Sequence, residues 1–409
     1  MTKKSIVFFT VGYPYGKGEI FLEQELKYAE ERFERVLIVS CVKKSGKVCQ
    51  YVPHNASLVS IRDNVSSAHL FAIRLSALFY YRTWAQLFLC LKSRGYKSLI
   101  SGLKAIILES SQIYMLIKNE NIWEHNYEFY YSYWLSGSAS YLALRRNRLS
   151  GICFSRAHGY DCFFERGFHP FRKEQFDKLD YIFPISHAGK EDLVTQGCDP
   201  KKIVVARLGV DNTFNILNPN NGLSKKTLVS CSNIVDLKRL DLIIETLETI
   251  DSVKIEWVHF GDGELRSRIE KFASERLSRK PNISYSFKGR VPISSILEFY
   301  ATKPIDLFIN CSDYEGIPVS VMEAMSFGIP CIARDVGGNR EIIQNNINGI
   351  LLPKNPTVQE ISSSIINFLN LSNDSVETIR MNAFNQYVSL YDAKRNFPKF
   401  WDDVIKTDI

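Results

Sequence analysis

The stretch "DLFINCSDYEGIPVSVMEAMSFGIPCIARD", residues 306–335, predicts the fold class of the chain. A short apolar run is followed by a Gly-Ile-Pro turn at 316–318, by a segment of helical spacing that ends before Gly328, and by a second apolar run. This strand, helix, strand order is typical of a parallel sheet wrapped by helices. Ligands of such sheets bind outside the carboxyl ends of the strands, so the turn is also a candidate site.

The same alternation of short apolar runs and amphipathic segments continues through both halves of the chain. The first half contains the strand candidates "SIVFFTV", "RVLIVSC", "YEFYYSYW", "ICFSRA", "YIFPIS" and "KIVVARL". The second half contains "TLVSCSN", "KIEWVHFG", "ISYSFKG", "DLFINCS", "PCIARD" and "GILLP". Each half predicts its own six-stranded set, so we expect two doubly wound α/β domains.

The length of the chain agrees with two domains, since 409 residues exceed one ordinary core. The segment "DNTFNILNPNNGLSKK" is rich in Asn, Pro and Gly, lacks periodicity, and reads as the linker. We expect an N-terminal, acceptor-side domain over 1–211, a linker over 212–226, a nucleotide-sugar domain over 227–385, and a helix over 386–409 that returns to the first domain.

Composition indicates a soluble globular protein, with 45% apolar and 23% charged residues. The nine cysteines are scattered and never spaced as Cys-x-x-Cys, which favours reduced, buried thiols in a cytoplasmic protein over disulfides or a zinc site. The N-terminus carries lysines before an apolar run, but no small-residue cleavage site follows. No later apolar run is expected to reach the roughly 18 residues of a membrane span.

The net charge of +7 is concentrated between Asn64 and Lys118. There, bases interleave with aromatic and apolar residues, and Glu109 is the single acid; the bases are Arg74, Arg82, Lys92, Arg94, Lys97, Lys104 and Lys118. One interpretation is a pair of core helices with solvated basic faces. The other is an interfacial contact of residues 69–104 with an anionic membrane leaflet. We do not expect nucleic acid as a partner, because no binding motif accompanies the bases.

Two loops of the first half have residues suited to a ligand. Gly12, Gly16 and Gly18 precede a helix that starts near Glu19, and glycines there let backbone amides approach an anion. A plain turn explains them equally well. In "SRAHGYDCFFER", His158 ends a predicted strand and is suited to donate a hydrogen bond in a cleft, although a lone histidine is more often structural.

The loop "SCSNIVDLKRLDLIIETL" places Lys238 and Arg239 at the start of a predicted helix, Leu240–Ile250. Cations at a helix N-terminus oppose the macrodipole preference for acids. A phosphate between these cations and the helix amides removes that conflict.

In the opening stretch, Glu315 lies before the predicted helix and Glu323 about a turn and a half inside it. They are therefore not a close acid/base pair on one helix face. Two carboxylates at different depths suit hydroxyls at two parts of one long ligand, with the amides of 317–320 between them for an oxyanion. The alternative is that Glu323 caps or ion-pairs locally and Glu315 is solvated.

The segment Asp306–Pro353 resembles the Glu-x7-Glu signature of the retaining "group 1", or family four, glycosyltransferases. Further similarity lies in "SRAHGYDCFFER", "RLGVD", "HFGDGELRSRIE" and "FKGRVPISSILEFY", and in "YPYGKGEIFLEQELKYAEERFERVLIVS", which is similar to members that build bacterial surface polysaccharides. The resemblance implies the GT-B fold, in which two Rossmann-like domains face each other across a cleft.

The resemblance also implies roles for single residues. Lys238 binds the donor diphosphate, Glu315 faces the donor sugar, Glu323 binds the ribose, and His158 touches the sugar from the other domain. These imply a catalytic set of His158, Lys238 and Glu315, and a donor site that includes Gly16, Gly18, Asn233, Arg239, Gly289 and Arg290 near the nucleobase, Gly316, Ile317, Pro318 and Val319.

The sequence departs from the family at one place. Asn233 stands where the family commonly has an arginine, and Arg239 where glycine is usual. Either Arg239 supplies the missing charge, or diphosphate binding is shared with other groups.

The implied reaction moves a hexose-type sugar from a UDP- or GDP-linked donor to a glycan acceptor, expected to be lipid-linked, in O-antigen, capsule or exopolysaccharide synthesis. No Asp-x-Asp pair occurs, so we expect neither a metal nor another cofactor. Retention fits front-face attack with the leaving phosphate as base; the alternative is a double displacement with Glu315 as nucleophile. A sugar-nucleotide epimerase or hydrolase and a non-catalytic nucleotide-sugar sensor are the rival functions.

Overall fold

The computed structural model describes residues 4–16, 19, 21–44, 50–63, 65–76, 78, 81–95, 98–124, 126–214, 216–219 and 224–406. The chain forms two compact units, the first of Met1–Ala206 with Phe397–Ile409 and the second of Arg207–Asn396. The predicted linker, 212–226, falls within the second unit.

A parallel sheet of six strands in the order β3-β2-β1-β4-β5-β6 forms the first unit. The strands are β1 (Lys4–Thr10), β2 (Phe33–Ser40), β3 (Ala56–Ser60), β4 (Phe129–Ser132), β5 (Ile152–Ala157) and β6 (Tyr181–Pro184). The predicted strand "KIVVARL" is wrong, since only Ile203 makes an isolated bridge, to Ile182. The strand that completes the set of six is β3, a short, half-polar edge strand that the apolar pattern did not reveal.

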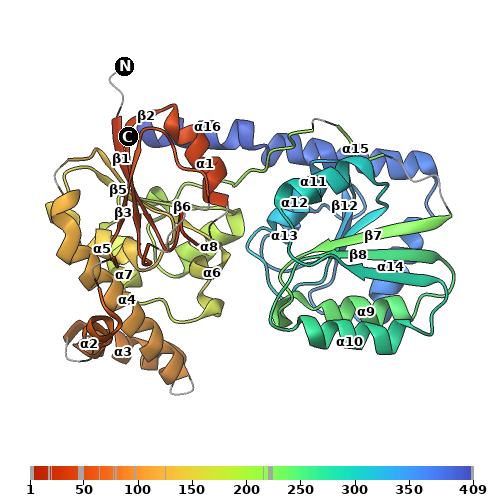
Figure 1. Cartoon of the computed structure of the whole chain (residues 1–409), viewed down its shortest axis with the longest axis horizontal. Helices are drawn as coiled ribbons and strands as arrows, with labels where there is room; N and C mark the ends of the chain where they lie inside the picture. Colours follow the sequence, from red (N-terminus) through yellow and green to blue (C-terminus); the bar gives the residue numbers. More distant parts are fainter. Residues whose placement is uncertain are drawn as a thin grey trace. The chain divides into compact units, whose positions relative to one another are not determined.

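Two cores lie on the two faces of this sheet, because successive side chains of a strand point to opposite faces. Ile6 and Phe8 pack with Trp401 on one face, while Val7 and Phe9 pack on the other. Figure 1 shows α1 (Phe21–Glu30) and α16 (Ala393–Ile405) on the first face and α4 (Leu99–Asn119), α5 (Ser138–Arg145) and α7 (Arg172–Lys178) on the second. The remaining helices are α2 (Ser67–Ser76), α3 (Tyr81–Arg94), α6 (Gly159–Cys162) and α8 (His187–Thr195).

The second unit repeats the architecture with the parallel order β12-β11-β10-β7-β8-β9. Its strands, all predicted from the sequence, are β7 (Lys225–Cys231), β8 (Lys254–Phe260), β9 (Ile283–Phe287), β10 (Leu307–Asn310), β11 (Cys331–Arg334) and β12 (Gly349–Leu352). Its helices are α9 (Leu240–Glu248), α10 (Arg266–Leu277), α11 (Ile293–Thr302), α12 (Val319–Met325), α13 (Asn339–Ile342), α14 (Val358–Leu369) and α15 (Asn373–Leu390). Figure 1 shows α9 and α10 along one face of this sheet.

Each sheet has a switch point, where the strand order reverses beside the first strand of the unit. β1 lies between β2 and β4, and β7 lies between β10 and β8. Loops that leave neighbouring strands in opposite directions open a crevice at the carboxyl ends, which is where ligands of such sheets bind. The predicted doubly wound class is confirmed, and the loops after β7 and β10 come together at the switch point of the second sheet.

The helical stretch Leu99–Ile122 corrects one expectation. It is long and apolar enough to cross a membrane, with a mean hydropathy of 1.3 over its most apolar window, of which 39% is buried. The buried side includes the Glu109 carboxylate, which accepts a hydrogen bond from the Ser140 hydroxyl. One face of this helix is therefore part of the core of the first unit.

The described cysteines carry free thiols, as predicted, and all but Cys231 are buried. Cys49 lies outside the described residues.

Candidate functional site

The switch point of the second sheet brings together Lys238 and Glu315. Lys238 ends a short 3-10 turn after β7, and Glu315 lies in the loop between β10 and α12. The Lys238 Nζ lies 2.7 Å from Glu315 Oε1, and the Asn310 amide nitrogen donates to the same oxygen at 3.1 Å. Glu315 is 8% exposed, so the alternative of a solvated carboxylate is wrong. The lysine that was predicted to bind phosphate is neutralised by this carboxylate.

The Gly-Ile-Pro turn after Glu315 is held by two glycines that follow β11. The amide of Gly338 donates to the carbonyl of Gly316 at 2.7 Å. Gly337 has φ +51°, and a Cβ there would lie 1.7 Å from the Glu315 carbonyl oxygen. Only glycine allows both this backbone conformation and this approach. The loop after β11 thus fixes the position of Glu315, a function that the sequence analysis missed.

The first turn of α12 presents unpaired amides. The helix begins at Val319, with Pro318 as its N-cap. Among the described residues, the amides of Val319 and Ser320 have no hydrogen-bond acceptor. These amides and the Lys238 ammonium are the groups here that suit the oxygens of a phosphate.

Glu323 lies inside α12, as predicted, in surroundings unlike those of Glu315. Within the described part of the chain, no side chain or amide bonds its carboxylate, so the alternative of a local cap or ion pair is wrong. Burial raises its pKa to about 8. Cys231 and Tyr300 are close enough that the Glu323 charge raises the pKa of each. The two glutamates therefore differ in their surroundings: Glu315 belongs to an ion pair, whereas burial of Glu323 favours its protonated form.

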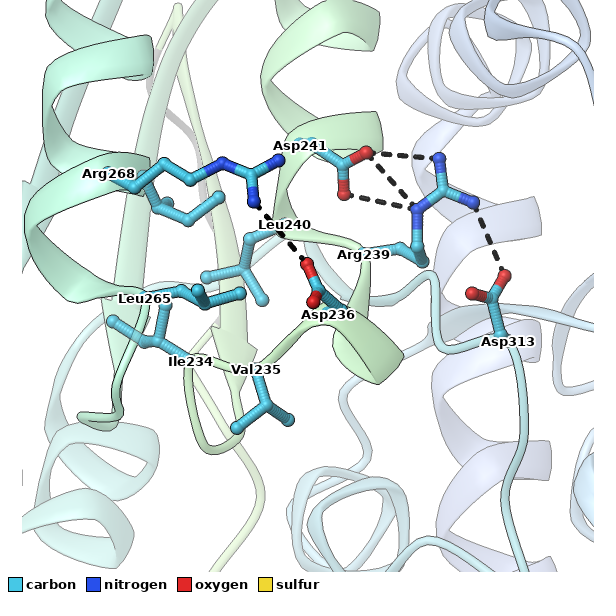
Figure 2. A pocket seen from close by; sticks show the side chains of 10 residues that line it. Ile234, Val235, Asp236, Arg239, Leu240, Asp241, Leu265, Arg268 and Asp313 are labelled. Atoms are coloured by element: carbon cyan, nitrogen blue, oxygen red, sulfur yellow. Dashed lines mark hydrogen bonds and ion pairs between the residues drawn. The ribbon is translucent and has the colours of Figure 1, made fainter. Parts of the chain in front are cut away.

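Arg239 does not offer a free charge. Its backbone is left-handed, with φ +49° and ψ +48°, which is the conformation that favours glycine at this position. Its guanidinium bonds the Asp241 carboxylate at 3.0–3.2 Å and Asp313 at 3.3 Å, and Asp241 is the main cause of its raised pKa. Figure 2 shows this guanidinium between the two aspartates, at the side of a pocket of about 200 Å³. The hypothesis that Arg239 replaces the arginine absent at Asn233 finds no support.

Asp313 is itself held by a second arginine. The guanidinium of Arg334, which is 4% exposed, bonds Asp313 and the carbonyl of Cys311. Asn233 is exposed and lies before this charged cluster on the loop after β7.

The region predicted to hold the nucleobase lies at the carboxyl ends of β8 and β9. The carbonyl of Gly289 accepts from the amide of Gly261 at 2.9 Å, and Gly289 has φ +70°. Arg290 follows as an exposed residue. Their role in binding stays a prediction.

In the first unit, the carboxylate of Glu19 fills the glycine loop after β1. Its oxygens accept from the amides of Val11 at 2.9 Å, Gly12 at 2.7 Å and Tyr13 at 2.8 Å. The Trp134 indole nitrogen, from the loop after β4, donates to it at 2.8 Å. Glu19 is 4% exposed, so the chain supplies its own anion to this nest of amides.

This arrangement corrects the expectation for the glycine loop. The amide of Gly16 donates to the carbonyl of Gly12 at 2.8 Å and is not free for a ligand. Gly18 lies outside the described residues. The acid directly after Gly18 was the available signal, and the sequence analysis interpreted it only as the start of a helix.

His158 directly follows β5, close to the predicted place at the strand end, and its neighbours fix the position of its ring. Nε2 lies 3.0 Å from the carbonyl of Tyr133, and because a carbonyl only accepts, we assign the ring proton to Nε2. The ring packs 4.7 Å from that of Tyr133 and 4.6 Å from that of Trp134. Burial, and then the charge of Arg156, lower its pKa to about 3. The ring is neutral and 8% exposed, so it fits the structural alternative, and a sugar contact stays a prediction.

Asp161 ties this loop to the loop after β4. Its carboxylate accepts the amides of His158 at 2.6 Å and Leu135 at 2.5 Å. Together with Glu19, it makes the carboxyl edge of the first sheet a set of cross-bonded loops. Within the described segments, no group of three or more His, Cys, Asp or Glu side chains is placed to hold a metal ion.

Comparison with known proteins now gives a family for the second unit. Residues 213–386 match the family described as glycosyl transferases group 1. They include Lys238 and the segment from Glu315 to Glu323. Residues 213–386 thus resemble a group 1 glycosyl transferase domain. The resemblance read from the sequence is confirmed for this domain.

Among the curated relatives of this chain are glycosyltransferases of bacterial polysaccharide synthesis. The amylovoran biosynthesis glycosyltransferase AmsK of Erwinia amylovora is 26% identical over 44% of this chain and 45% of its own length. An Escherichia coli UDP-Gal:alpha-D-GlcNAc-diphosphoundecaprenol alpha-1,3-galactosyltransferase is 29% identical over 39% of this chain and 38% of its own. The chain spans about half the length of the curated relatives it matches.

Solved structures match the whole chain in fold. Anabaena Alr3699/HepE, in complex with UDP and glucose, has a TM-score of 0.67 at 15% identity, covering 99% of this chain and 100% of that one. The lipopolysaccharide outer core galactosyltransferase WaaB has a TM-score of 0.68 at 16% identity over the same shares. These likenesses confirm the GT-B fold class.

Proposed function

We propose that the protein is a retaining glycosyltransferase that moves a hexose-type sugar from a UDP- or GDP-linked donor to a glycan acceptor in bacterial polysaccharide synthesis. The observation that carries the proposal is the Lys238–Glu315 pair beside the unpaired amides of Val319 and Ser320, inside the group 1 domain. A lysine and unpaired amides at one switch point suit a diphosphate, and the relatives' names give the class of pathway.

In this proposal, the donor diphosphate takes the place of Glu315 as the partner of Lys238. Breaking the bond from the anomeric carbon leaves negative charge on the phosphate, so the Lys238 ammonium and the Val319 and Ser320 amides stabilise the transition state. Glu315, kept in place by Asn310, then accepts a hydrogen bond from a hydroxyl of the sugar. Glu323 accepts hydrogen bonds from the ribose hydroxyls.

The stereochemical part of the proposal is front-face attack without a metal, in which the leaving phosphate takes the acceptor proton. Glu315 as a nucleophile is the alternative, and its bond to Lys238 makes it a weaker one, because the ammonium withdraws charge from the attacking oxygen.

We propose a lipid-linked acceptor and peripheral contact with the cytoplasmic face of a membrane. The name of one relative states a diphosphoundecaprenol-linked acceptor. Helices α2, α3 and α4 present exposed apolar and basic side chains, here called the basic-apolar surface: Phe71, Arg74, Leu75, Trp84, Phe88, Leu91, Lys92, Ile100, Lys104 and Leu108. Apolar groups beside bases suit the boundary of an anionic leaflet.

The reaction is tested by incubating the protein with labelled sugar nucleotides, with and without bacterial membranes as acceptor source. A transferase moves label to the membrane fraction, an epimerase or hydrolase turns the donor over without membranes, and a sensor binds but releases no nucleotide. Lys238→Ala and Glu323→Ala should each lose transfer. Full transfer in both variants overturns the site assignment.

The membrane contact is tested by co-sedimentation with phosphatidylglycerol vesicles. The triple variant Arg74→Gln, Lys92→Gln, Lys104→Gln should lose binding. The matched control changes three exposed lysines outside the surface, Lys173, Lys271 and Lys399, to Gln. Equal binding of both triples counts against the contact.

A further inference from the structure

Arg94, the last residue of α3, carries a positive charge with no counterion among the described residues. Its guanidinium lies over the ring of Phe164, with 4.1 Å from Cζ to the ring centroid. Its Nε and Nη2 atoms are shielded from water and, within the described part of the chain, have no hydrogen-bond acceptor. An unpaired, partly desolvated guanidinium costs free energy that an anion would recover.

The place of Arg94 in the fold says what kind of anion fits. On α3, Trp84, Phe88 and Leu91 are exposed by 60%, 67% and 39% and follow the i, i+4, i+7 spacing of one helix face. Phe164 begins the 3-10 turn that follows α6, in the loop that His158 starts. Arg94 therefore lies where an apolar stripe of the basic-apolar surface meets the loop from the carboxyl end of β5.

Phe164 has charged neighbours of both signs, since Glu165 and Arg166 follow it in the 3-10 turn. His169 lies in the same loop, and burial, then Arg172 and then Arg94, lower its pKa to about 3. The carboxylate bonded to this loop, Asp192, is engaged by the Phe164 amide at 3.0 Å and by the Gln196 amide nitrogen at 2.6 Å. His169 is therefore neutral, and Arg94 is the cation stacked on the Phe164 ring.

We propose that Arg94, supported by Phe164, is the subsite for the phosphate of a lipid-linked acceptor. The inference deepens the proposed function and rests on it. A planar guanidinium stacked on a ring presents its donors in a fixed plane, which suits phosphate oxygens. The stripe next to it suits the first apolar carbons of the lipid. The phosphate of such an acceptor lies between its tail and its sugar, as Arg94 lies between the stripe and the β5 loop.

The exposed bases of the same surface fit a different ligand. Lys92 is exposed, and no aromatic ring of the described residues lies under its ammonium group, so it senses the diffuse potential of anionic headgroups. Lys92 therefore serves as the matched control for Arg94, because both are cations of the last turn of α3.

The test uses the full chain saturated with UDP, so that Lys238 is occupied, and farnesyl diphosphate and farnesol as probes in calorimetric titration. Farnesyl diphosphate should bind and farnesol should not. Arg94→Gln should weaken farnesyl diphosphate binding about ten- to hundredfold, the usual loss for a charged hydrogen bond, and Arg94→Lys should weaken it less. Lys92→Gln should leave it within about twofold.

Three results overturn the subsite: equal affinity of Arg94→Gln and the unchanged protein, an equal loss in Lys92→Gln, or a loss in Arg94→Gln that appears only with phosphatidylglycerol vesicles, which would assign Arg94 to bilayer headgroups. Thermal unfolding of each variant shows whether it folds, and Arg94→Lys keeps the test decisive if Arg94→Gln does not. UDP binding is measured separately, in the unchanged protein and in Lys238→Ala. If UDP does not bind, the proposed donor site is wrong. Farnesyl diphosphate binding to the Lys238→Ala variant, with and without the Arg94→Gln change, then still tests the Arg94 subsite.

Discussion

Replacing Glu323 by glutamine tests whether this carboxyl group is protonated in the ligand-free protein. Burial raises the pKa of Glu323 to about 8, and no described residue bonds its carboxylate. Glutamine has nearly the shape of the protonated acid and never ionises. In the acidic range the variant should therefore match the unchanged protein in stability, and the two should diverge as the pH rises.

The sign and size of that divergence follow from proton linkage. From its ordinary value of 4.5, the pKa of Glu323 moves to about 8, so the native state keeps a proton that the unfolded chain has lost. Its stabilisation is complete below the unfolded pKa and is lost as the pH rises through the folded one. The limiting slope is about 1.4 kcal/mol per pH unit, and for a half-buried group we expect about 1–2 kcal/mol across the whole range.

Urea unfolding of the unchanged protein and of Glu323→Gln, measured at several pH values between about 5 and 8, gives the difference. Glu109 and Asp161, whose pKa values burial raises to about 7, add a slope common to both proteins, so only the difference reports on Glu323. A difference that does not change with pH refutes the reasoning.

Nucleotide binding supplies the second readout for Glu323. An ionised carboxylate accepts ribose hydroxyls better than a protonated one, so UDP should bind the unchanged protein more tightly as the pH rises toward about 8. Glu323→Gln should lack that dependence and thereby correct for the ionisation of UDP itself. If UDP affinity depends on pH in the same way in both proteins, Glu323 does not bind the ribose.

Three further changes probe the rest of the two units. Lys238→Ala should weaken UDP binding about tenfold or more, as for a lost charged hydrogen bond, measured by calorimetry; unchanged affinity contradicts the diphosphate role. Glu19→Ala leaves three amides and an indole without an acceptor and should cost at least about 3 kcal/mol in urea unfolding, against about 0.5 kcal/mol or less for the partly exposed Glu23→Ala in α1, the helix that begins after Glu19. Gly337→Ala should cost about 2 kcal/mol or more, because its Cβ meets the Glu315 carbonyl, whereas Gly95→Ala, also at positive φ but with nothing within 4 Å, should cost about 1 kcal/mol; equal costs refute the contact.

Much of the fold was readable from the sequence because buried parallel strands are continuous apolar runs. All six strands of the second sheet were predicted. In the first sheet, Ala56–Ser60 was missed because an edge strand has a half-polar sequence, and "KIVVARL" was chosen in its place because its apolar content resembles that of a core strand.

The site was predictable where a motif is local and unpredictable where the contact crosses the chain. The loop position of Glu315 and the helical position of Glu323 follow from spacing alone. The ion pair of Glu315 with Lys238 joins two strands far apart in sequence, and the approach of Gly337 to Glu315 depends on the loop after a third strand. The role of Glu19 was missed for another reason. In the sequence, a glutamate that accepts hydrogen bonds from the amides of its own loop cannot be told from a glutamate on the surface.

The bond between Lys238 and Glu315 has a consequence for turnover. An anion without a sugar that binds Lys238 leaves the Glu315 carboxylate, which is 8% exposed, without its counterion. A sugar nucleotide gives each residue a new partner, because its phosphate binds Lys238 and a sugar hydroxyl donates to Glu315. Under the proposed roles, the ion pair therefore favours ligands that carry both a phosphate and a sugar. After transfer, the nucleotide product no longer carries the sugar that bonded Glu315. Glu315 can then pair with Lys238 again, so the ion pair that disfavours ligands without a sugar also favours release of the product.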